Sequence, residues 1–330
     1  MKYFWMIFLM SIGIQAQVKE SRDTILMGSR FSITIIDENL EKANQHIDLI
    51  ISEIVRIEEA ISDWKPSSQV SKVNQNAGIQ PVKVDEEVFN LTKRALYFSE
   101  ISDGAFDISF AAMEKIYDYQ EGWMEEFPSD SIRLKAIEKV GYQNIVLDEV
   151  EQTIFLKLPG MKIGFGATGK GYAADKAKEF AQSLGIQAGI INASGDMATW
   201  GMNLNNEFWK IGVQNPRKPQ KPLDILKVQN AAMTTSGSYE KFVLIGDKRY
   251  SHIINPKTGI PAIGLISVTV IGPNAEFANG LSTSMMVLGM EEGLRVLKEF
   301  PAYASLMMTD EGELKRSSNY RKVKRSLKKD

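Results

Sequence analysis

The sequence predicts an α+β protein with a mixed, largely antiparallel sheet core and long flanking helices. Two observations support this fold class. Long amphipathic helical patterns occur in the first third of the chain and again near its end, and short alternating segments bounded by glycine, proline and asparagine lie between them. These strand-like segments are spaced as hairpins and do not alternate regularly with helices, which argues against a repeated βαβ fold. At 330 residues the chain suffices for one large domain or two interleaved lobes.

Two helices are expected in the first third of the chain. Residues 38–62 carry one apolar stripe at alternating steps of three and four residues, and residues 64–66 end it. The second helix starts near Asp85, which suits an N-cap, and runs to Asp103 and Gly104. Both are most simply packing elements.

Alternation replaces helical periodicity between residues 142 and 166. Strands are expected at 145–147, 154–158 and 161–165, followed by a glycine-rich turn into a helix that Gly185 ends. Residues 186–192 read as another strand and 192–201 as a tight loop. Further strands are expected at 208–213, 242–245, 250–254 and 265–271, and one long helix after Pro273.

The two ends of the chain differ from the remainder, residues 17–314, which we expect to form the folded domain. Lys2, an apolar run over 3–14 and a cleavage point after Ala16 predict a secretory signal over residues 1–16, with a retained anchor as the alternative. Half of residues 315–330 are Lys or Arg, which predicts a solvated, frayed tail. The alternative is contact of this tail with an anionic membrane surface.

The composition excludes several classes of partner and anchor. A formal net charge of -2 and dispersed aromatic residues give no electrostatic case for a nucleic-acid partner. The chain has no cysteine, so it has neither disulfides nor a lipid-modified cysteine. An exported protein of this kind is expected in the periplasm or at the outer face of the cytoplasmic membrane, and not as a lipoprotein.

The glycine-rich turn at residues 164–171 favours an anion. It satisfies G-x-x-x-x-G-K, but Gly171 stands where a P-loop needs a hydroxyl for the nucleotide's magnesium, which argues against a P-loop. Glycines nevertheless let a phosphate approach backbone N–H groups, and Lys170 at the helix start favours an anion there. The alternative is that the glycines serve only tight packing of the strand against the helix.

His252 is the candidate proton acceptor of the chain. It lies at the end of a predicted strand before a Pro/Gly turn, where a side chain can be held rigidly beside a cleft. The residues alone leave open a structural histidine or a catalytic base. The other histidine, His46, lies beside the apolar stripe of the first helix and is expected to be exposed or half-buried at the surface.

Asn279 and Thr283 form a candidate metal-binding pair. They are four residues apart, so on a helix their side-chain oxygens lie on one face. Hard oxygen ligands suit a magnesium ion that keeps water and binds substrate phosphates. Polar packing within the helix is the simpler alternative.

Taken together, these motifs resemble the FAD:protein FMN transferase (ApbE-like) family from Met27 to Gly289. Each block is weak alone, but seven in the right order make the resemblance specific. The blocks are MGS (27–29), ISDWKPSSQVSKVN (61–74), GAFD (104–107), GATGKGYAADKA (166–177), INASGDMATWG (191–201), TTSGSYEKF with HIINPKTGIP (234–261), and SVTVIGPNAEFANGLSTSMMVLG (267–289).

The resemblance implies a T-fold-like architecture and a transferase that uses FAD and Mg²⁺. Such an enzyme attaches FMN through a phosphoester to a threonine of an acceptor protein, here expected to be an exported redox protein, and releases AMP. His252 is implied as the base, and Lys170 as the residue that neutralises the phosphates. The implied FAD-binding residues are Met27, Trp64, Ala105, Phe106, Asp107, Lys170 and Ile253. The implied magnesium ligands are the backbone oxygen of Ala167 and the side chains of Asn279 and Thr283.

The chain departs from the family pattern at four positions. Asn279 replaces the metal-binding Asp, Gly164 replaces the Asp before the glycine block, and Asn255 replaces the Asp of H-I-I-D-P, while Ala167 replaces the second glycine. Three of these changes remove negative charge, so we expect the divalent ion to be held less strongly. An active transferase is expected. The alternatives on the same scaffold are a flavin-binding protein with little catalysis and an FAD pyrophosphatase.

Overall fold

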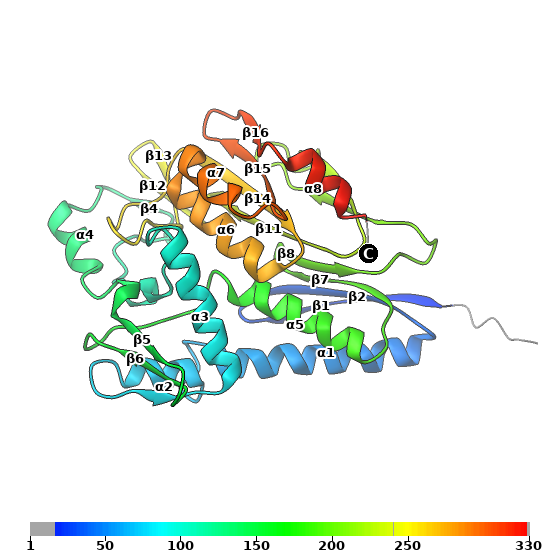
Figure 1. The fold of residues 1–330 in the computed structure, drawn as a ribbon. Helices are drawn as coiled ribbons and strands as arrows, with labels where there is room; N and C mark the ends of the chain where they lie inside the picture. The colour runs from blue at the N-terminus through cyan, green and yellow to red at the C-terminus, as the bar shows by residue number, and fades with distance from the viewer. Residues whose placement is uncertain (1–16, 240, 329–330) are drawn as a thin grey trace, which may run out of the picture.

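An eight-stranded antiparallel sheet forms the centre of the molecule in a computed structural model, which describes residues 17–239 and 241–328 (Figure 1). The predicted signal segment, residues 1–16, lies outside the described residues. The strand order is β1-β2-β7-β8-β11-β14-β15-β16. These strands are β1 (Val18–Leu26), β2 (Ser29–Asp37), β7 (Ala188–Ala193), β8 (Asp196–Trp200), β11 (Ala231–Gly237), β14 (Leu265–Gly272), β15 (Ala304–Thr309) and β16 (Leu314–Arg316).

Three small sheets surround the central sheet. One pairs β9 (Trp209–Val213) with β10 (Asp224–Val228), and a second contains β3 (Val82–Lys83), β6 (Thr153–Leu156) and β5 (Ile145–Asp148). The third, which we call the satellite sheet, contains β13 (Lys248–Ser251), β12 (Phe242–Ile245) and β4 (Trp123–Met124). In the satellite sheet β12 and β4 run parallel.

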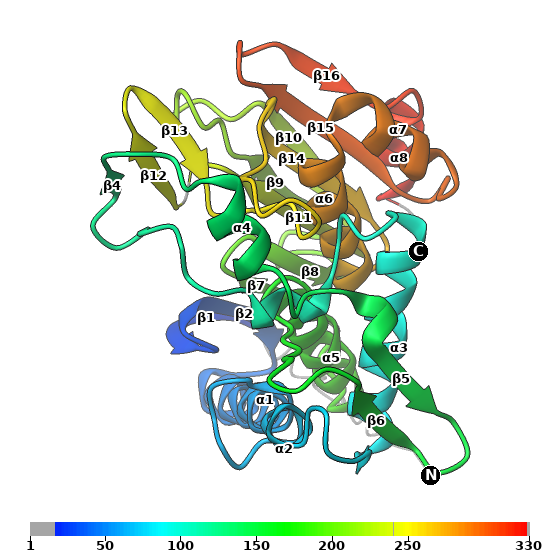
Figure 2. The ribbon, with the colours of Figure 1, turned by 90° about the vertical axis from the view of Figure 1, so that its left-hand side faces the viewer.

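Helices flank the sheets, as Figures 1 and 2 show. They are α1 (Leu40–Ile61), α2 (Gln69–Gln75), α3 (Glu86–Ile101), α4 (Asp130–Ala136), α5 (Gly169–Ser183), α6 (Ala275–Leu288), α7 (Met290–Lys298) and α8 (Tyr320–Ser326), with 3₁₀ helices η1 (Ile108–Ala112) and η2 (Tyr142–Asn144). The apolar stripe of the first predicted helix is buried along α1. No helix of the described part is long and apolar enough to cross a membrane. The predicted α+β class is confirmed.

The central sheet is buried on both faces because side chains alternate along a strand. Ile33 and Ile35 of β2 belong to the main core, which also contains the apolar faces of α1, α5 and α6. Ile36 faces the other way, into a second core with Trp209 of β9 and Tyr320 of α8. The sheet therefore supports helices on one face and a hairpin with the last helix on the other.

The structure corrects two expectations between residues 161 and 201. Residues 161–165 form no strand, because the side chain of Asn74 holds this segment instead of a neighbouring strand. The Asn74 amide donates to the carbonyl of Ile163 at 2.9 Å and accepts from its N–H at 2.8 Å. The predicted loop at 192–201 is instead the end of β7, a two-residue turn and all of β8, which pair as a hairpin.

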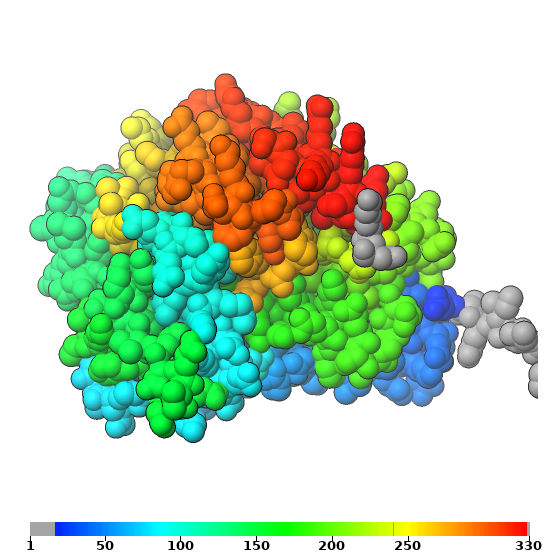
Figure 3. Space-filling view, viewed as in Figure 1, coloured from blue at the N-terminus to red at the C-terminus, as the bar shows by residue number. Residues whose placement is uncertain are grey.

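Two expectations near the C-terminus are also wrong. The helix after Pro273 is divided into α6 and α7 at Gly289, whose φ of 78° no helical residue adopts. The basic segment is folded, not frayed: Tyr320 and Val323 of α8 are buried, and Lys324 pairs with Asp224 at 2.5 Å. Figure 3 shows the red C-terminal segment lying on the body of the molecule.

Candidate active site

One cavity of about 570 Å³ collects nearly all of the residues singled out from the sequence. Its volume lies within the range of small-molecule sites. Elements far apart in the chain form its walls: the turn after α1, η1, the start of α5, the β7–β8 turn, β11, the segment after β13, and α6. The predicted residues on its lining are Trp64, Ala105, Phe106, Asp107, Ala167, Lys170, His252, Ile253, Asn279 and Thr283.

Met27 is the predicted residue that the structure leaves outside this lining. It lies in the turn between β1 and β2 with a φ of 50°, and its N–H donates to Glu58 Oε2 at 3.1 Å. Its side chain packs against the main core. Ser29, two residues further along, reaches the cavity instead.

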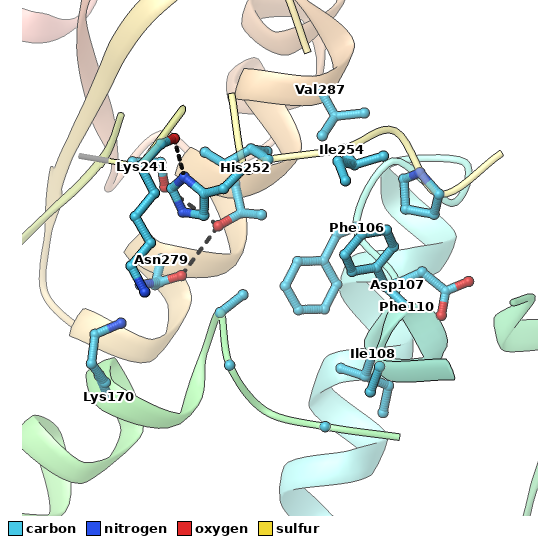
Figure 4. Close-up of a pocket in the computed structure, with 18 of the residues that line it drawn as sticks. Phe106, Asp107, Ile108, Phe110, Lys170, Lys241, His252, Ile254, Asn279 and Val287 are labelled. Carbon is cyan, nitrogen blue, oxygen red and sulfur yellow. Dashed lines mark hydrogen bonds between the residues drawn. The ribbon is translucent and has the colours of Figure 1, made fainter. Parts of the chain in front are cut away.

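Two lysines enter the same end of the cavity, as Figure 4 shows. Lys170 lies in the first turn of α5, where the helix N-terminus adds its own positive potential. Lys241 comes from the loop before β12 and was not predicted, although it stands within the 234–261 block. Two ammonium groups beside a helix N-terminus make this end of the cavity suited to phosphate.

His252 is oriented by one hydrogen bond to the backbone. Its Nδ1 lies 3.0 Å from the carbonyl oxygen of Lys241, and a carbonyl can only accept, so Nδ1 carries the proton and Nε2 is left with its lone pair. Burial lowers the pKa of His252 below its usual 6.5, and the charges of Lys241 and Lys170 act in the same direction. The imidazole is therefore neutral at pH 7 and able to accept a proton.

Asn279 and Thr283 lie next to each other on the face of α6 that lines the cavity. Thr283 Oγ1 donates to Asn279 Oδ1 at 3.3 Å, which confirms that their oxygens share one helix face. The start of α6 is held by Asp175 of α5, whose carboxylate accepts from the N–H groups of Ala275 at 2.9 Å and Glu276 at 2.8 Å. Asp175 thereby fixes α6 against α5, and with it Asn279 relative to Lys170.

Asp196 is a functional candidate that sequence reasoning missed. Its side chain is 4% exposed, and its Oδ2 has no hydrogen-bond partner, although Lys170 Nζ lies 3.4 Å away. Burial raises the pKa of Asp196, while the charge of Lys170 and hydrogen bonding by Asn279 oppose the increase. Asp196 is the single acid of the 191–201 block, which is the signal that could have identified it.

The opposite end of the cavity is aromatic. Phe106 and Phe110 lie together there in Figure 4, and Trp64 stands at the rim with 79% of its surface exposed. Flat apolar surfaces of this kind suit a ring system. The cavity therefore combines a cationic end with a ring-binding end.

Asp107 lines the cavity but already uses its carboxylate to hold the local backbone. Oδ1 accepts from the N–H of Ser109 at 2.8 Å and caps η1, and Oδ2 accepts from the N–H of Tyr142 at 2.8 Å. Figure 4 shows the carboxylate directed away from the other labelled side chains. The geometry thus assigns Asp107 to shaping the aromatic end.

Asn255 serves the turn that follows His252. Its Oδ1 accepts from the N–H of Lys257 at 2.9 Å, and its backbone N–H donates to the carbonyl of Ile260 at 2.8 Å. An amide oxygen performs this role without a charge. The change from the family's Asp at this position therefore leaves the turn intact.

Comparison with known proteins agrees with this geometry. The model of the ApbE family matches residues 27–307. The FAD:protein FMN transferase of Treponema pallidum is 27% identical over 93% of this chain and 90% of its own length. The FAD:protein FMN transferase of Klebsiella pneumoniae is 28% identical over 91% and 92%.

Solved structures agree as well. The ApbE protein from Thermotoga maritima superimposes with a TM-score of 0.84 at 29% identity, covering 93% of this chain and 99% of that one. The flavin transferase ApbE from Vibrio cholerae, at 23% identity, shares the fold with a TM-score of 0.80 over 93% of this chain and 99% of its own. The family match spans most of the chain, and so this protein belongs to the ApbE family.

Proposed function

We propose that the protein is an FAD:protein FMN transferase that joins FMN to a threonine of an acceptor protein and releases AMP. The observation that carries this proposal is one cavity in which two lysines and a neutral histidine nitrogen stand at one end and aromatic side chains at the other. A dinucleotide has a matching division, with a pyrophosphate and flat rings. Relatives from Treponema pallidum and Klebsiella pneumoniae carry this activity in their names.

The residues supply what phosphoryl transfer needs, which is positioning, charge neutralisation and a proton acceptor. The threonine oxygen attacks the phosphorus of the FMN half, and the bond from that phosphorus to the oxygen bridging to AMP breaks. AMP leaves with the bridging oxygen, and the threonine proton passes to Nε2 of His252. Lys170 and Lys241 offset the negative charge of the phosphate oxygens throughout.

The site also fits a divalent cation. A buried carboxylate oxygen without a hydrogen-bond partner, Oδ2 of Asp196, is the kind of group that a cation satisfies. Asp196, Asn279, Thr283 and the backbone oxygen of Ala167 would hold Mg²⁺, with Asp196 supplying the negative charge that Asn279 lacks. When bound, Mg²⁺ neutralises phosphate oxygens. The described residues contain no group of three or more His, Cys, Asp or Glu arranged for a metal, so this donor set depends on neutral oxygens.

The test is incubation with FAD, Mg²⁺ and a threonine-bearing flavoprotein domain purified without its covalent flavin. The expected result is an acceptor that gains the mass of FMN, fluoresces after denaturing electrophoresis, and appears together with equimolar AMP. Free FMN and AMP with an unlabelled acceptor would instead show a pyrophosphatase. Flavin that stays bound and intact would show a binding protein.

We further propose that the chain is exported and acts on an exported redox protein. The basis is the signal-like segment at residues 1–16. Cell fractionation with N-terminal sequencing tests this proposal. A mature protein in the periplasmic fraction that begins at Gln17 is expected, and a cytoplasmic protein that still begins at Met1 would contradict it.

A further inference from the structure

Asp63 is a cavity-lining carboxylate that nothing above has used. It lies in the turn after α1, next to Trp64, and faces the same cavity as Phe110 and Ala111 of η1. It forms no ion pair or hydrogen bond with another side chain of the described residues, although Lys162 is near enough for its charge to act on it. A carboxylate held in this way beside aromatic rings is available to a ligand.

Gly164 leaves the space that Asp63 occupies. A Cβ atom added at Gly164 would lie 3.0 Å from Asp63 Oδ2 and 3.1 Å from the Cβ of Ala111, which is tighter than ordinary van der Waals contact. The backbone there has little freedom to move, because the N–H of Gly164 donates to the carbonyl of Ile108 at 3.0 Å and Asn74 binds both polar groups of Ile163. A side chain at position 164 would therefore press against the carboxylate of Asp63, which would have to shift by a few tenths of an ångström.

The two positions are related through the family pattern. The resemblance to the family implies an Asp where this chain has Gly164, and this chain has an Asp at position 63, whose Oδ2 would lie 3.0 Å from a Cβ atom at position 164. The two positions are far apart in the sequence and meet only in the fold. A carboxylate from the turn after α1 thus stands beside the position at which the resemblance implies one.

The surroundings of Asp63 determine what it can bind. A carboxylate repels phosphate, and the two lysines that attract phosphate lie at the other end of the cavity. An ionised carboxylate only accepts hydrogen bonds, so its ligand must offer an O–H or N–H group. The neighbouring aromatic side chains place a ring system close by.

We propose that Asp63 is a substrate-binding residue that accepts a hydrogen bond from a sugar hydroxyl or ring N–H of FAD, in place of a carboxylate at position 164. This inference rests on the proposed function, since it takes FAD as the ligand. It makes positions 63 and 164 an exchangeable pair. The pair holds the part of FAD that is remote from the phosphates.

The experiment measures FAD affinity from the quenching of flavin fluorescence, without any acceptor, so transfer activity plays no part. Asp63→Ser should weaken FAD binding by about tenfold to a hundredfold, the loss expected for a hydrogen bond to a charged group, and Asp63→Asn by less. Glu59→Gln is the matched control, because Glu59 belongs to the same helix end but pairs with Lys65 outside the cavity. Its FAD affinity should equal that of the wild type.

The decisive experiment moves the carboxylate from position 63 to position 164. Gly164→Asp alone should weaken binding, because two carboxylates then compete for one space, whereas Gly164→Asp in the Asp63→Ser background should restore affinity to within a few-fold of the wild type. A version that also carries Ala111→Gly removes the remaining 3.1 Å contact. Thermal melts confirm that each variant is folded.

Two results would overturn the proposal, and they differ from a failure of the proposed function. Asp63→Ser that binds FAD as tightly as the wild type would show that the carboxylate does not touch the ligand. If Gly164→Asp did not restore FAD affinity to the Asp63→Ser variant, even with Ala111→Gly and an unchanged thermal melt, the two positions would not be exchangeable. A wild-type protein that does not bind FAD would instead reject the proposed function itself.

Discussion

The two walls of the cavity that carry its polar groups are supported very differently. Lys170 and Asn279 stand on helices α5 and α6, which pack into the main core and are joined through Asp175. Lys241 and His252 flank the satellite sheet, whose own core has four buried hydrophobic side chains. These are Tyr117, Val243, Ile245 and Ile254.

This difference separates two tasks of the site. In the proposed function the helix wall supplies Lys170 and Asn279, which would bind phosphate and cation and therefore need a fixed geometry. The satellite wall supplies His252, the proton acceptor of the proposed function, and its smaller core predicts a lower free energy of local opening. Local motion at His252 would therefore leave Lys170 and Asn279 on the helix wall in place.

Removing the base should give the largest effect. His252→Ala should lower the rate of FMN transfer by about 10²- to 10⁴-fold, the usual contribution of general base catalysis, while FAD affinity changes little. Acceptor labelling and flavin fluorescence measure the two quantities separately. His46→Ala is the matched control, because His46 pairs with Asp37 away from the cavity.

The pH dependence of the transfer rate is a second test of the role of His252. Since the pKa of His252 lies below 6.5, its neutral form predominates at pH 7, and the transfer rate should decline only as the pH falls below about 6.5. A decline that begins above pH 7 would contradict this assignment, as would normal labelling by His252→Ala.

The proposed cation site, which Asp196 of β8 shares with Asn279 of the helix wall, should respond next. Asp196→Asn should weaken Mg²⁺ binding about tenfold or more, because ligand charge strongly sets the affinity of oxygen sites. Isothermal titration calorimetry measures this on the FAD-loaded protein. Asn279→Asp should strengthen binding, and the double variant should lie near the wild type. Unchanged affinity in Asp196→Asn would show that Asp196 is not a ligand.

The contact of α5 with the start of α6 through Asp175 should give the next-largest effect. Asp175→Ala leaves two buried N–H groups at the start of α6 without an acceptor, and should lower the free energy of unfolding by about 2 kcal/mol. Asp175→Asn keeps one acceptor oxygen and should lose less. Urea denaturation measures both variants. If Asp175→Ala were as stable as the wild type, the hydrogen bonds of Asp175 would not hold α6 against α5.

The smallest effect is expected on the satellite wall. Tyr117→Phe removes a hydroxyl that donates to the carbonyl of Gly259 at 2.8 Å, which costs about 1 kcal/mol and should speed hydrogen exchange in β12 and β13 about fivefold. Exchange in α5 and α6 should not change. Tyr172→Phe is the control, because its hydroxyl donates to Glu87 in the helical part. Equal acceleration in both walls would mean that they open as one unit.

The helices and strands that were predicted correctly are those in which the local spacing of apolar residues shows which face is buried. The stripe of α1 and the alternation of β12 each report a buried face, and both elements lie where the pattern places them. Residues 161–165 have the same alternation but were predicted wrongly. Their backbone is satisfied by the distant side chain of Asn74, which no local pattern reveals.

Local sequence patterns also revealed only part of the site. Lys170, His252 and Asn279 were found because each stands in a recognisable local setting, such as a helix start or a turn. Asp196 was missed because its importance comes from burial without a hydrogen-bond partner, which only the fold produces. Asp63 was missed because its proposed role depends on the absence of a side chain at Gly164, which is distant in the sequence but adjacent in the fold.

The cavity draws on residues from Ser29 to Val287, and this spread has a consequence for folding. A chain that has emerged only in part, or folded in part, has no complete site. Ligand binding therefore requires the fold as far as α6, and free FAD at a hundred times its dissociation constant would stabilise that fold by about 2.7 kcal/mol through mass action. Bound FAD would link the turn after α1 to α6, so that proteolysis of the chain between these elements should be slowest when FAD is present.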